Sequence, residues 1–185
     1  MPSKLILPPL PQLASHTDVV RHFIKHCRKH LHEELAWFAG QDALAKALEE
    51  AAYARCKCGK RLPHQRRLLK HVIPQSYALL QAQAQLLERS QSFDDLFFQI
   101  EKILVSVHGA GDLYLYDTAL RLGTYLGLHP TRVFLQTGAR TGAQKLSLGH
   151  KARSLPLLDF PKPFHVLEPF EMENLLCIYK DELRP

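Results

Sequence analysis

The sequence has few of the features that mark secreted or membrane-spanning proteins. Only 4 of its 185 residues are cysteines, which is too few, and too unevenly spaced, for a disulfide framework in a domain of this size. We therefore expect reduced thiols and a cytoplasmic location. No stretch approaches the roughly 18 consecutive apolar residues that a membrane span needs, so we expect no membrane partner. Hydrophobic residues nevertheless make up 46% of the chain, which excludes a disordered or fibrous protein.

Acidic residues are missing from two long intervals, one between Glu50 and Glu88 and one between Asp117 and Asp159. The chain carries 24 Lys and Arg against 18 Asp and Glu, a net charge of +6, with 11 His that can add to it. The cations of the two intervals are Arg55, Lys57, Lys60, Arg61, Arg66, Arg67 and Lys70, then Arg121, Arg132, Arg140, Lys145, Lys151 and Arg153. Basic surfaces without nearby carboxylates favour phosphate backbones, because binding releases condensed counterions. The alternatives are a solvated positive face or a docking site for an acidic protein.

The spacing of apolar residues predicts an all-α fold, a single-domain bundle of about seven helices. We expect a Pro-rich N-terminal arm over 1–16 and one helical domain over 17–185, divided into 17–90, 91–146 and 147–185. Helices are expected over about 17–39, 42–54, 65–90, 93–107, 112–126, 130–135, 138–146 and 168–183. Pro74 should break or kink the third of them. A Pro-rich extended segment, 147–167, should precede the last helix.

The segment Gly59–Arg67, with the sequence GKRLPHQRR, is the densest polar string in the chain. Its basic side chains could clamp phosphates, since arginine binds them through two parallel hydrogen bonds. The same string could instead form an active centre of a metal-independent nuclease, with His64 as general acid or base and an arginine stabilising the phosphorus centre. Phosphate binding alone would require fewer functional groups than catalysis.

Residues 103–111, ILVSVHGAG, lie between two expected helices. From Phe97 to Leu122 the chain resembles the helix-hairpin-helix motif of DNA-binding and DNA-repair proteins. The resemblance implies a grip on the DNA backbone that does not depend on sequence. Gly109 and Gly111 would allow a tight turn, so that N–H groups at the start of the next helix could approach a phosphate.

The string Tyr116-Asp117-Thr118 is similar to the segment that supplies the catalytic aspartate in DNA glycosylases carrying this hairpin. The resemblance implies a catalytic role for Asp117. The alternative is an ordinary aspartate on a helix surface or cap.

The region around Gly127 also resembles a helix-turn-helix motif. Its second helix, from Pro130 to about Leu135, would present Thr131, Arg132 and Gln136 to base edges in the major groove. Beyond it, Gly138–Ala143 with Arg140 could complete a phosphate cradle. This string lacks the Gly-Lys-Ser/Thr ending of a nucleotide-binding loop, and we expect no cofactor.

Cys56 and Cys58, with His64 and His71, offer four side chains that can bind zinc. One residue between the cysteines is shorter than zinc ribbons prefer, so we expect no metal and treat this group as a weak zinc candidate. Several strings of the chain, such as GDLYLYDTALRLG, look like those of uncharacterised bacterial proteins.

Together these patterns predict a nucleic-acid-binding protein, with DNA favoured over RNA and the oligomeric state open. The residues expected to contact nucleic acid are Lys60, Arg61, Arg66, Arg67, Gly109, Gly111, Arg121, Arg132 and Arg140. One alternative is a small nucleic-acid-processing enzyme, glycosylase-like or nuclease, that uses His64 and Asp117. The other is an interaction module with a basic face for an acidic partner.

Overall fold

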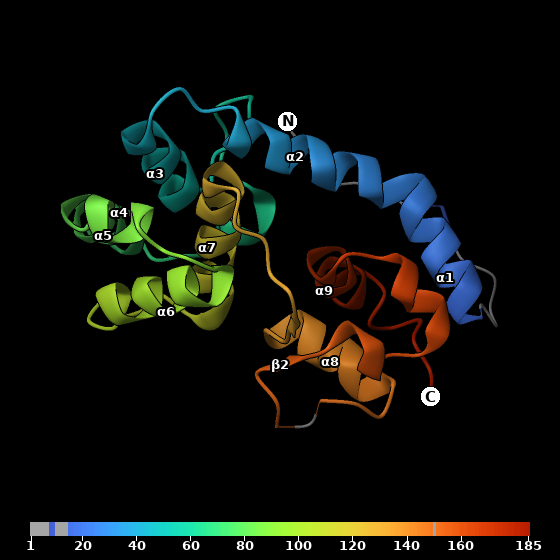
Figure 1. Ribbon diagram of the computed structural model, residues 1–185. Coiled ribbons are helices and arrows are strands. Elements are labelled where there is room, and N and C mark those ends of the chain that lie inside the picture. The colour runs from blue at the N-terminus through green and yellow to red at the C-terminus, as the bar shows by residue number, and fades with distance from the viewer. Residues whose placement is uncertain (1–7, 10–14, 150) are drawn as a thin grey trace. The chain divides into compact units, whose positions relative to one another are not determined.

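The computed structural model of the protein describes residues 8–9, 15–149 and 151–185. Within these residues the chain forms nine α-helices and one two-stranded sheet (Figure 1). The all-α class predicted from the sequence is therefore confirmed. The predicted Pro-rich arm, 1–16, lies almost entirely outside the described residues. In the described part of the chain, no helix has both the length and the apolar character needed to cross a bilayer.

Packing divides the chain into two compact units. The described residues of the central unit are Glu33–His129, and those of the terminal unit are 8–9, 15–32, 130–149 and 151–185. The sequence predicts one domain with internal divisions after residues 90 and 146. The units instead group the first helical segment with the last third of the chain. Apolar spacing identifies the buried face of a helix, but it does not identify the distant segment that covers that face.

The first helical segment runs without a break from His16 to Ala39. It consists of α1 (His16–Phe23), a π-helical stretch (Ile24–Arg28) and α2 (Lys29–Ala39). Ser15 caps it, because its Oγ accepts the Asp18 N–H at 3.2 Å while the Asp18 carboxylate accepts the Ser15 N–H at 3.1 Å. The helix predicted over about 17–39 is confirmed. The boundary between the two units falls within α2, after His32.

Five helices form the rest of the central unit. They are α3 (Leu44–Tyr53), α4 (Val72–Ala82), α5 (Ala84–Glu88), α6 (Phe93–Leu104) and α7 (Asp112–Leu126). The expected single helix over 65–90 is wrong in two places. Its first residues form turns, and it is interrupted at Gln83 rather than at Pro74. Pro74 lies in the first turn of α4, where its missing N–H costs no intrahelical hydrogen bond.

The terminal unit holds β1 (Val133–Phe134), α8 (Thr137–Lys145), β2 (Ser154–Leu155) and α9 (Pro169–Ile178). The two strands are antiparallel, with Val133 opposite Leu155. The helix expected over 130–135 is therefore wrong. Val and Phe suit a short strand, and the two residues between Pro130 and the strand are too few for a stable helix. The Pro-rich segment before α9 contains short 3-10 turns at Leu157–Asp159 and Lys162–Val166.

Helices α8 and α9 approach each other closely because two glycines of α8 face α9. A Cβ atom at Gly138 would lie 2.5 Å from Cys177 Sγ, and one at Gly142 would overlap the backbone carbonyl of Leu176. Leu176 belongs to the core of the terminal unit and is fully buried. The contact between the two backbones therefore requires glycine at 142.

We predict that Gly142→Ala destabilises the terminal unit. Its methyl group would push against backbone atoms, and overpacking of this kind costs about 1–3 kcal/mol. Urea unfolding, followed by circular dichroism, would measure the loss. Gln144→Ala on the exposed face of the same helix is the matched control and should leave stability nearly unchanged. Equal stability of the two variants would contradict the close approach.

A buried carboxylate also holds the terminal unit together. The side chain of Glu171 is 1% exposed and accepts hydrogen bonds from Arg28 Nε and Nη2, both at 2.7 Å, and from His32 Nε2 at 2.6 Å. Burial alone would raise the pKa of Glu171, but the hydrogen bonds from Arg28, from the Glu168 N–H and from His32 outweigh it and lower the pKa below its ordinary value. The ionised carboxylate thus joins the first helical segment to α9.

Because the folded-state pKa of Glu171 is lowered, its contribution to stability should be complete above the pKa of an unfolded glutamate and should vanish as the pH falls through the folded-state pKa. At neutral pH we expect Glu171→Gln to cost about 3 kcal/mol, as when one partner of a buried ion pair is removed. Near pH 3 the difference from the wild type should shrink. Thermal unfolding across this pH range would measure both effects, with Asp181→Asn as an exposed control. A difference that stays constant with pH would contradict this assignment.

Candidate nucleic-acid interface

A short loop with hairpin-like pairing follows α3 and carries the first exposed cations. The Leu62 N–H donates to Ala54 O at 2.8 Å, and the Cys56 N–H donates to Lys60 O at 2.9 Å. The Gly59 N–H closes the tip by donating to Cys56 O at 2.7 Å, and Gly59 has a φ of +75°. These backbone bonds hold residues 57–60 at the surface, where they are all exposed.

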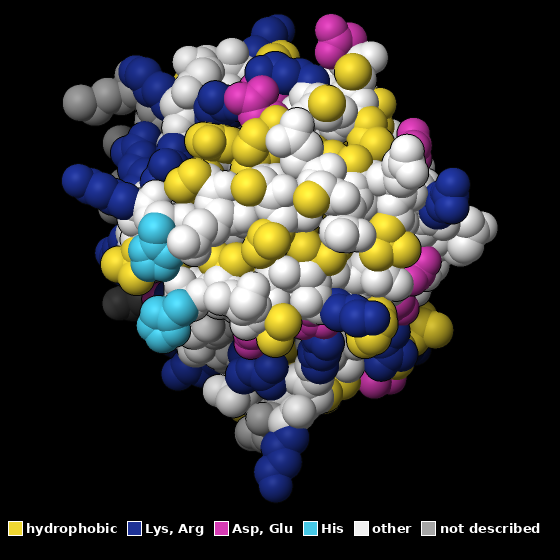
Figure 2. Space-filling model, turned by 90° about the vertical axis from the view of Figure 1, so that its left-hand side faces the viewer, with side chains coloured by type: hydrophobic (Ala, Val, Ile, Leu, Met, Phe, Trp, Pro, Cys, Tyr) yellow, Lys and Arg dark blue, Asp and Glu magenta, His cyan; other side chains and the backbone are white. Residues whose placement is uncertain are grey.

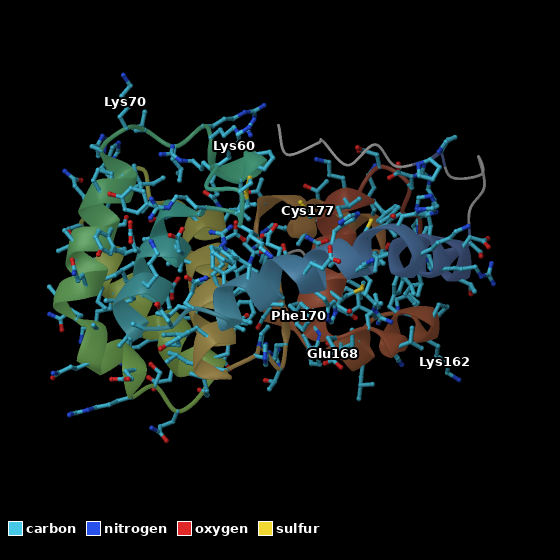
Figure 3. The ribbon with its side chains drawn as sticks, turned by 90° about the horizontal axis from the view of Figure 1, so that it is seen from above. Lys60, Lys70, Lys162, Glu168, Phe170 and Cys177 are labelled. Carbon is cyan, nitrogen blue, oxygen red and sulfur yellow. A yellow bond between two sulfur atoms is a disulfide. The ribbon has the colours of Figure 1, made fainter. Side chains whose placement is uncertain are left out.

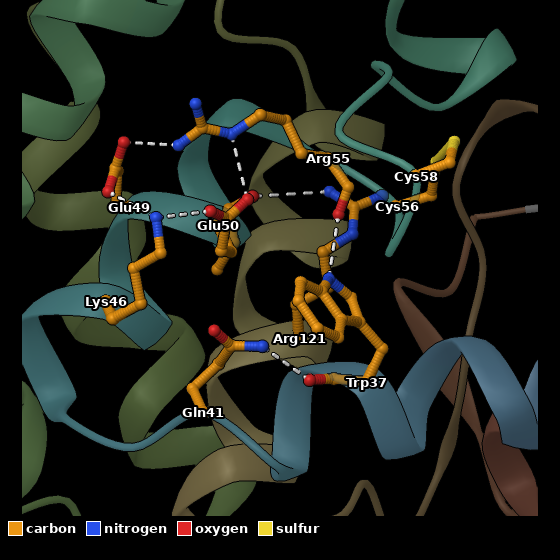
Figure 4. Close-up of polar contacts among 10 residues, drawn as sticks. Trp37, Gln41, Lys46, Glu49, Glu50, Arg55, Cys56, Cys58 and Arg121 are labelled. Atoms are coloured by element: carbon orange, nitrogen blue, oxygen red, sulfur yellow. Dashed lines mark hydrogen bonds and ion pairs between the residues drawn. A yellow bond between two sulfur atoms is a disulfide. The ribbon is translucent and has the colours of Figure 1, made fainter.

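An ion-pair network fixes the start of this loop (Figure 4). Arg55 Nε donates to Glu50 at 2.8 Å, and Arg55 Nη2 pairs with Glu49. Lys46 Nζ lies 2.7 Å from Glu50 and 3.0 Å from Glu49. The hydrogen bonds from Arg55 and Lys46 lower the pKa of Glu49. Although Arg55 begins the acid-free interval, acids of α3 neutralise it, so we assign it to the support of the loop.

Five cations between residues 57 and 70 project into solvent, and we call this stretch the basic segment. They are Lys57, Lys60, Arg66, Arg67 and Lys70. Within the described residues, none of these five forms an ion pair. Lys60 and Lys70 lie at the same edge of the central unit (Figure 3). Figure 2 shows Lys and Arg side chains gathered along an edge of the molecule, with histidines beside them.

The glycine hairpin between α6 and α7 lies against one end of the basic segment. His71 Nε2 donates to His108 O at 3.0 Å. Gly109 has a φ of +95°, and a Cβ atom there would lie 3.1 Å from Val72 Cγ2, so both conformation and space favour glycine. Gly111 is the N-cap of α7 and needs neither property, since its φ is −79° and a Cβ atom would meet nothing within 4 Å. Folding thus brings the two predicted phosphate-binding features together.

Arg121 does not belong to this surface, and the prediction that it contacts nucleic acid is wrong because its side chain is buried. It is 3% exposed. Its guanidinium pairs with Asp117 at 3.2 Å and lies 5.6 Å from the centre of the Phe38 ring. Asp117 also accepts a hydrogen bond from Gln65 Nε2 at 2.5 Å. The carboxylate is thus the counterion of a buried arginine, within α7 and beside the basic segment.

Two more predicted contact residues, Arg132 and Arg140, use their guanidinium groups inside the terminal unit. Arg132 donates to Ser154 Oγ at 3.0 Å, and Arg140 donates to the carbonyls of Ala152 and Leu135, both at 2.8 Å. We therefore assign both to packing rather than to phosphate contacts. The helix-turn-helix interpretation is wrong as well, because its second helix is strand β1 and Gln136 is buried.

The helix expected over 138–146 is confirmed as α8, but the phosphate cradle suggested over Gly138–Ala143 is wrong, because Arg140 donates to backbone carbonyls instead. Cys56 and Cys58 form a disulfide rather than the expected free thiols. Among the residues that the structure describes, no group of three or more His, Cys, Asp or Glu side chains is placed to hold a metal ion. His64 belongs to the 3-10 turn Pro63–Gln65, and its side chain lies outside the described part of the structure.

Comparison with known proteins identifies no family for this chain. A scan of protein-family models, a search of curated proteins and a search of solved structures each found no match.

Sequence reasoning missed three features of this interface. Lys57 and Lys70 are named among the cations of the first acid-free interval but not among the residues expected to contact nucleic acid. The contact between His71 and His108 links residues 37 apart, and no local pattern reports it. The role of Gln65, which is buried and faces Asp117, also depends on the fold alone.

We predict that Asp117→Asn lowers the stability of the central unit by about 3 kcal/mol, because it leaves the Arg121 charge buried without its counterion. Asp42→Asn, a substitution at an exposed loop residue, is the control and should change stability little. Chemical denaturation of both variants would measure the difference. If Asp117→Asn were as stable as the control, Asp117 would not be the counterion of Arg121.

Proposed function

We propose that the protein binds nucleic acid, DNA in preference to RNA, through the basic segment and the adjoining glycine hairpin of the central unit. Lys60, Arg66 and Arg67 would contact phosphates, and Lys57 and Lys70 would extend the contact. Arg61, which is half-buried, would contact phosphates at the edge of this surface. Contacts of this kind depend on the phosphate backbone and give affinity without sequence preference.

The observation that carries this proposal is the hydrogen bond between His71 and His108. It places a run of exposed cations next to backbone that can approach a phosphate closely. The first turn of a helix leaves N–H groups without intrahelical partners, and the helix dipole favours an anion there. At α7, this turn follows Gly111, which has no side chain to stand between its backbone and a ligand.

Removal of two adjacent cations should weaken binding and its dependence on salt. Each lost phosphate contact should reduce the steepness of log affinity against log salt concentration by about 0.9. The slope for Arg66→Ala/Arg67→Ala should therefore be shallower than that of the wild type by about 1.8. The control Arg89→Ala/Lys102→Ala removes the same charge from other exposed positions of the central unit and should lose much less. Fluorescence anisotropy with duplex DNA, duplex RNA and single-stranded probes at several salt concentrations would measure this.

If the two double variants showed the same reduction in salt dependence, the result would contradict a local interface and would indicate only attraction by net charge. If no probe binds at low salt, the proposal fails, and the basic segment is left as a docking site for an acidic protein.

Asp112 provides a separate test, because its carboxylate lies in the first turn of α7, beside the proposed phosphate position. We predict that Asp112→Asn strengthens DNA binding, since it removes a repulsive charge. Asp94→Asn, at the corresponding turn of α6, should have no such effect. A gain of the same size in both variants would argue against a phosphate at the hairpin, and the same anisotropy assay would show it.

A second candidate function is a small nucleic-acid-processing enzyme that uses His64 and Asp117. The hydrogen bond between Gln65 and Asp117 favours it, because it brings the residue after His64 to this carboxylate. Prolonged incubation with labelled duplex DNA should then yield strand breaks or abasic sites that are lost in His64→Ala. Unchanged DNA after incubation would leave binding as the function.

A further inference from the structure

The disulfide between Cys56 and Cys58 is a poor candidate for a structural bond. It joins residues only 2 apart in the sequence, and the stabilisation from a disulfide grows with the length of the loop that it closes. The loop is already closed by three backbone hydrogen bonds between Ala54 and Leu62. Ala54 and Leu62 also pack with Phe38 in a small buried cluster beneath the loop. Its fold therefore does not depend on the bond.

The two cysteines differ in their exposure to solvent. Cys58 lies at the exposed tip, whereas Cys56 is half-buried and packs against the cluster of Phe38, Ala54 and Leu62. Lys57 stands between the two cysteines, and Lys60 follows closely. Nearby cations stabilise a thiolate and make it a better leaving group. Exposed Cys58 is thus the cysteine open to attack, and Cys56 can leave as a thiolate.

An open cleft of about 670 Å³ adjoins this bond, a size in the range of small-molecule sites. Its lining includes Cys56 and Lys57 on the loop, and Trp37, Glu33 and Glu34 on α2. The Trp37 ring is held in place by its Nε1, which donates to Arg55 O at 3.2 Å (Figure 4). The cleft therefore offers an aromatic surface and charges of both signs beside a disulfide, which suits a small zwitterionic thiol.

We propose that Cys56 and Cys58 form a redox-active pair that exchanges with low-molecular-weight thiols. In reduction, the thiolate of R–SH attacks Cys58 Sγ, the bond between the cysteines breaks, and Cys56 leaves as a thiolate that takes up a proton. A second R–S⁻ then attacks the R sulfur of the mixed disulfide. This step releases R–S–S–R and a Cys58 thiolate, which is protonated in turn. Two thiols are oxidised as one disulfide is reduced, and oxidation follows the reverse course. This activity needs no nucleic acid and does not rest on the function proposed above.

The test is a redox titration of the purified full chain without nucleic acid. The protein is equilibrated in a series of mixtures of reduced and oxidised glutathione and then quenched with acid. Free thiols are alkylated, and the masses of the resulting peptides are measured by mass spectrometry. We expect one two-electron transition, in which peptides containing Cys56 and Cys58 gain two alkyl groups together. The other two cysteines, Cys27 and Cys177, lie outside the disulfide, and Cys177→Ser should leave the transition unchanged. A pair that stays reduced, or stays oxidised, in every mixture would overturn the proposal.

Two single variants test the assigned roles. With oxidised glutathione, Cys56→Ser should retain one glutathione on exposed Cys58, whereas Cys58→Ser should retain much less on half-buried Cys56. Equal labelling, or the reverse order, would contradict the assignment of Cys58 as the attacked sulfur. The wild-type melting temperature should be the same in the reduced and oxidised forms, and a large fall on reduction would show a structural bond instead.

Discussion

The central unit depends on a buried charge, the guanidinium of Arg121. A cation in the interior is tolerated only when an anion and hydrogen-bond acceptors surround it. Asp117 supplies the anion from the same helix, Phe38 of α2 presents its ring, and the carbonyl of Ala51 in α3 lies 3.5 Å from Arg121 Nη1. Through Gln65, the same carboxylate also reaches the basic segment. Three helices and the segment that carries the exposed cations therefore meet at this one group.

This arrangement separates the arginines of the chain into two kinds. Some arginines are buried or half-buried and donate their N–H groups to acceptors of the fold, namely Arg28, Arg55, Arg121, Arg132 and Arg140. Arg66 and Arg67 are instead exposed, as are the neighbouring lysines, although Arg66 Nε donates to Arg61 O at 3.4 Å. A sequence shows only that a residue is cationic, whereas its role depends on which acceptors the fold places around it. The surface proposed to bind nucleic acid is consequently smaller than the two acid-free intervals suggest.

The loop after α3 supports both proposals by separate means. Its tip begins the basic segment with Lys57 and Lys60, and the same tip holds the disulfide beside the cleft of Trp37. Backbone hydrogen bonds and the ion pairs of Arg55 keep the loop in shape, so cations and sulfur atoms can stay exposed without loss of the fold. The nucleic-acid function and the thiol exchange can therefore each fail without the other.

Local patterns in the sequence determined most of the helices. Ser92 accepts the Asp95 N–H at the start of α6, and Gly127 ends α7 with a φ of +73°, as their spacing predicts. Such signals are reliable because helix contacts and caps involve residues three or four apart. Only the tertiary structure decided that β1 pairs with β2, that Arg121 is buried, and that the hairpin meets the basic segment. Each of these outcomes depends on contacts between residues far apart in the chain, and such partners are chosen by packing rather than by local spacing.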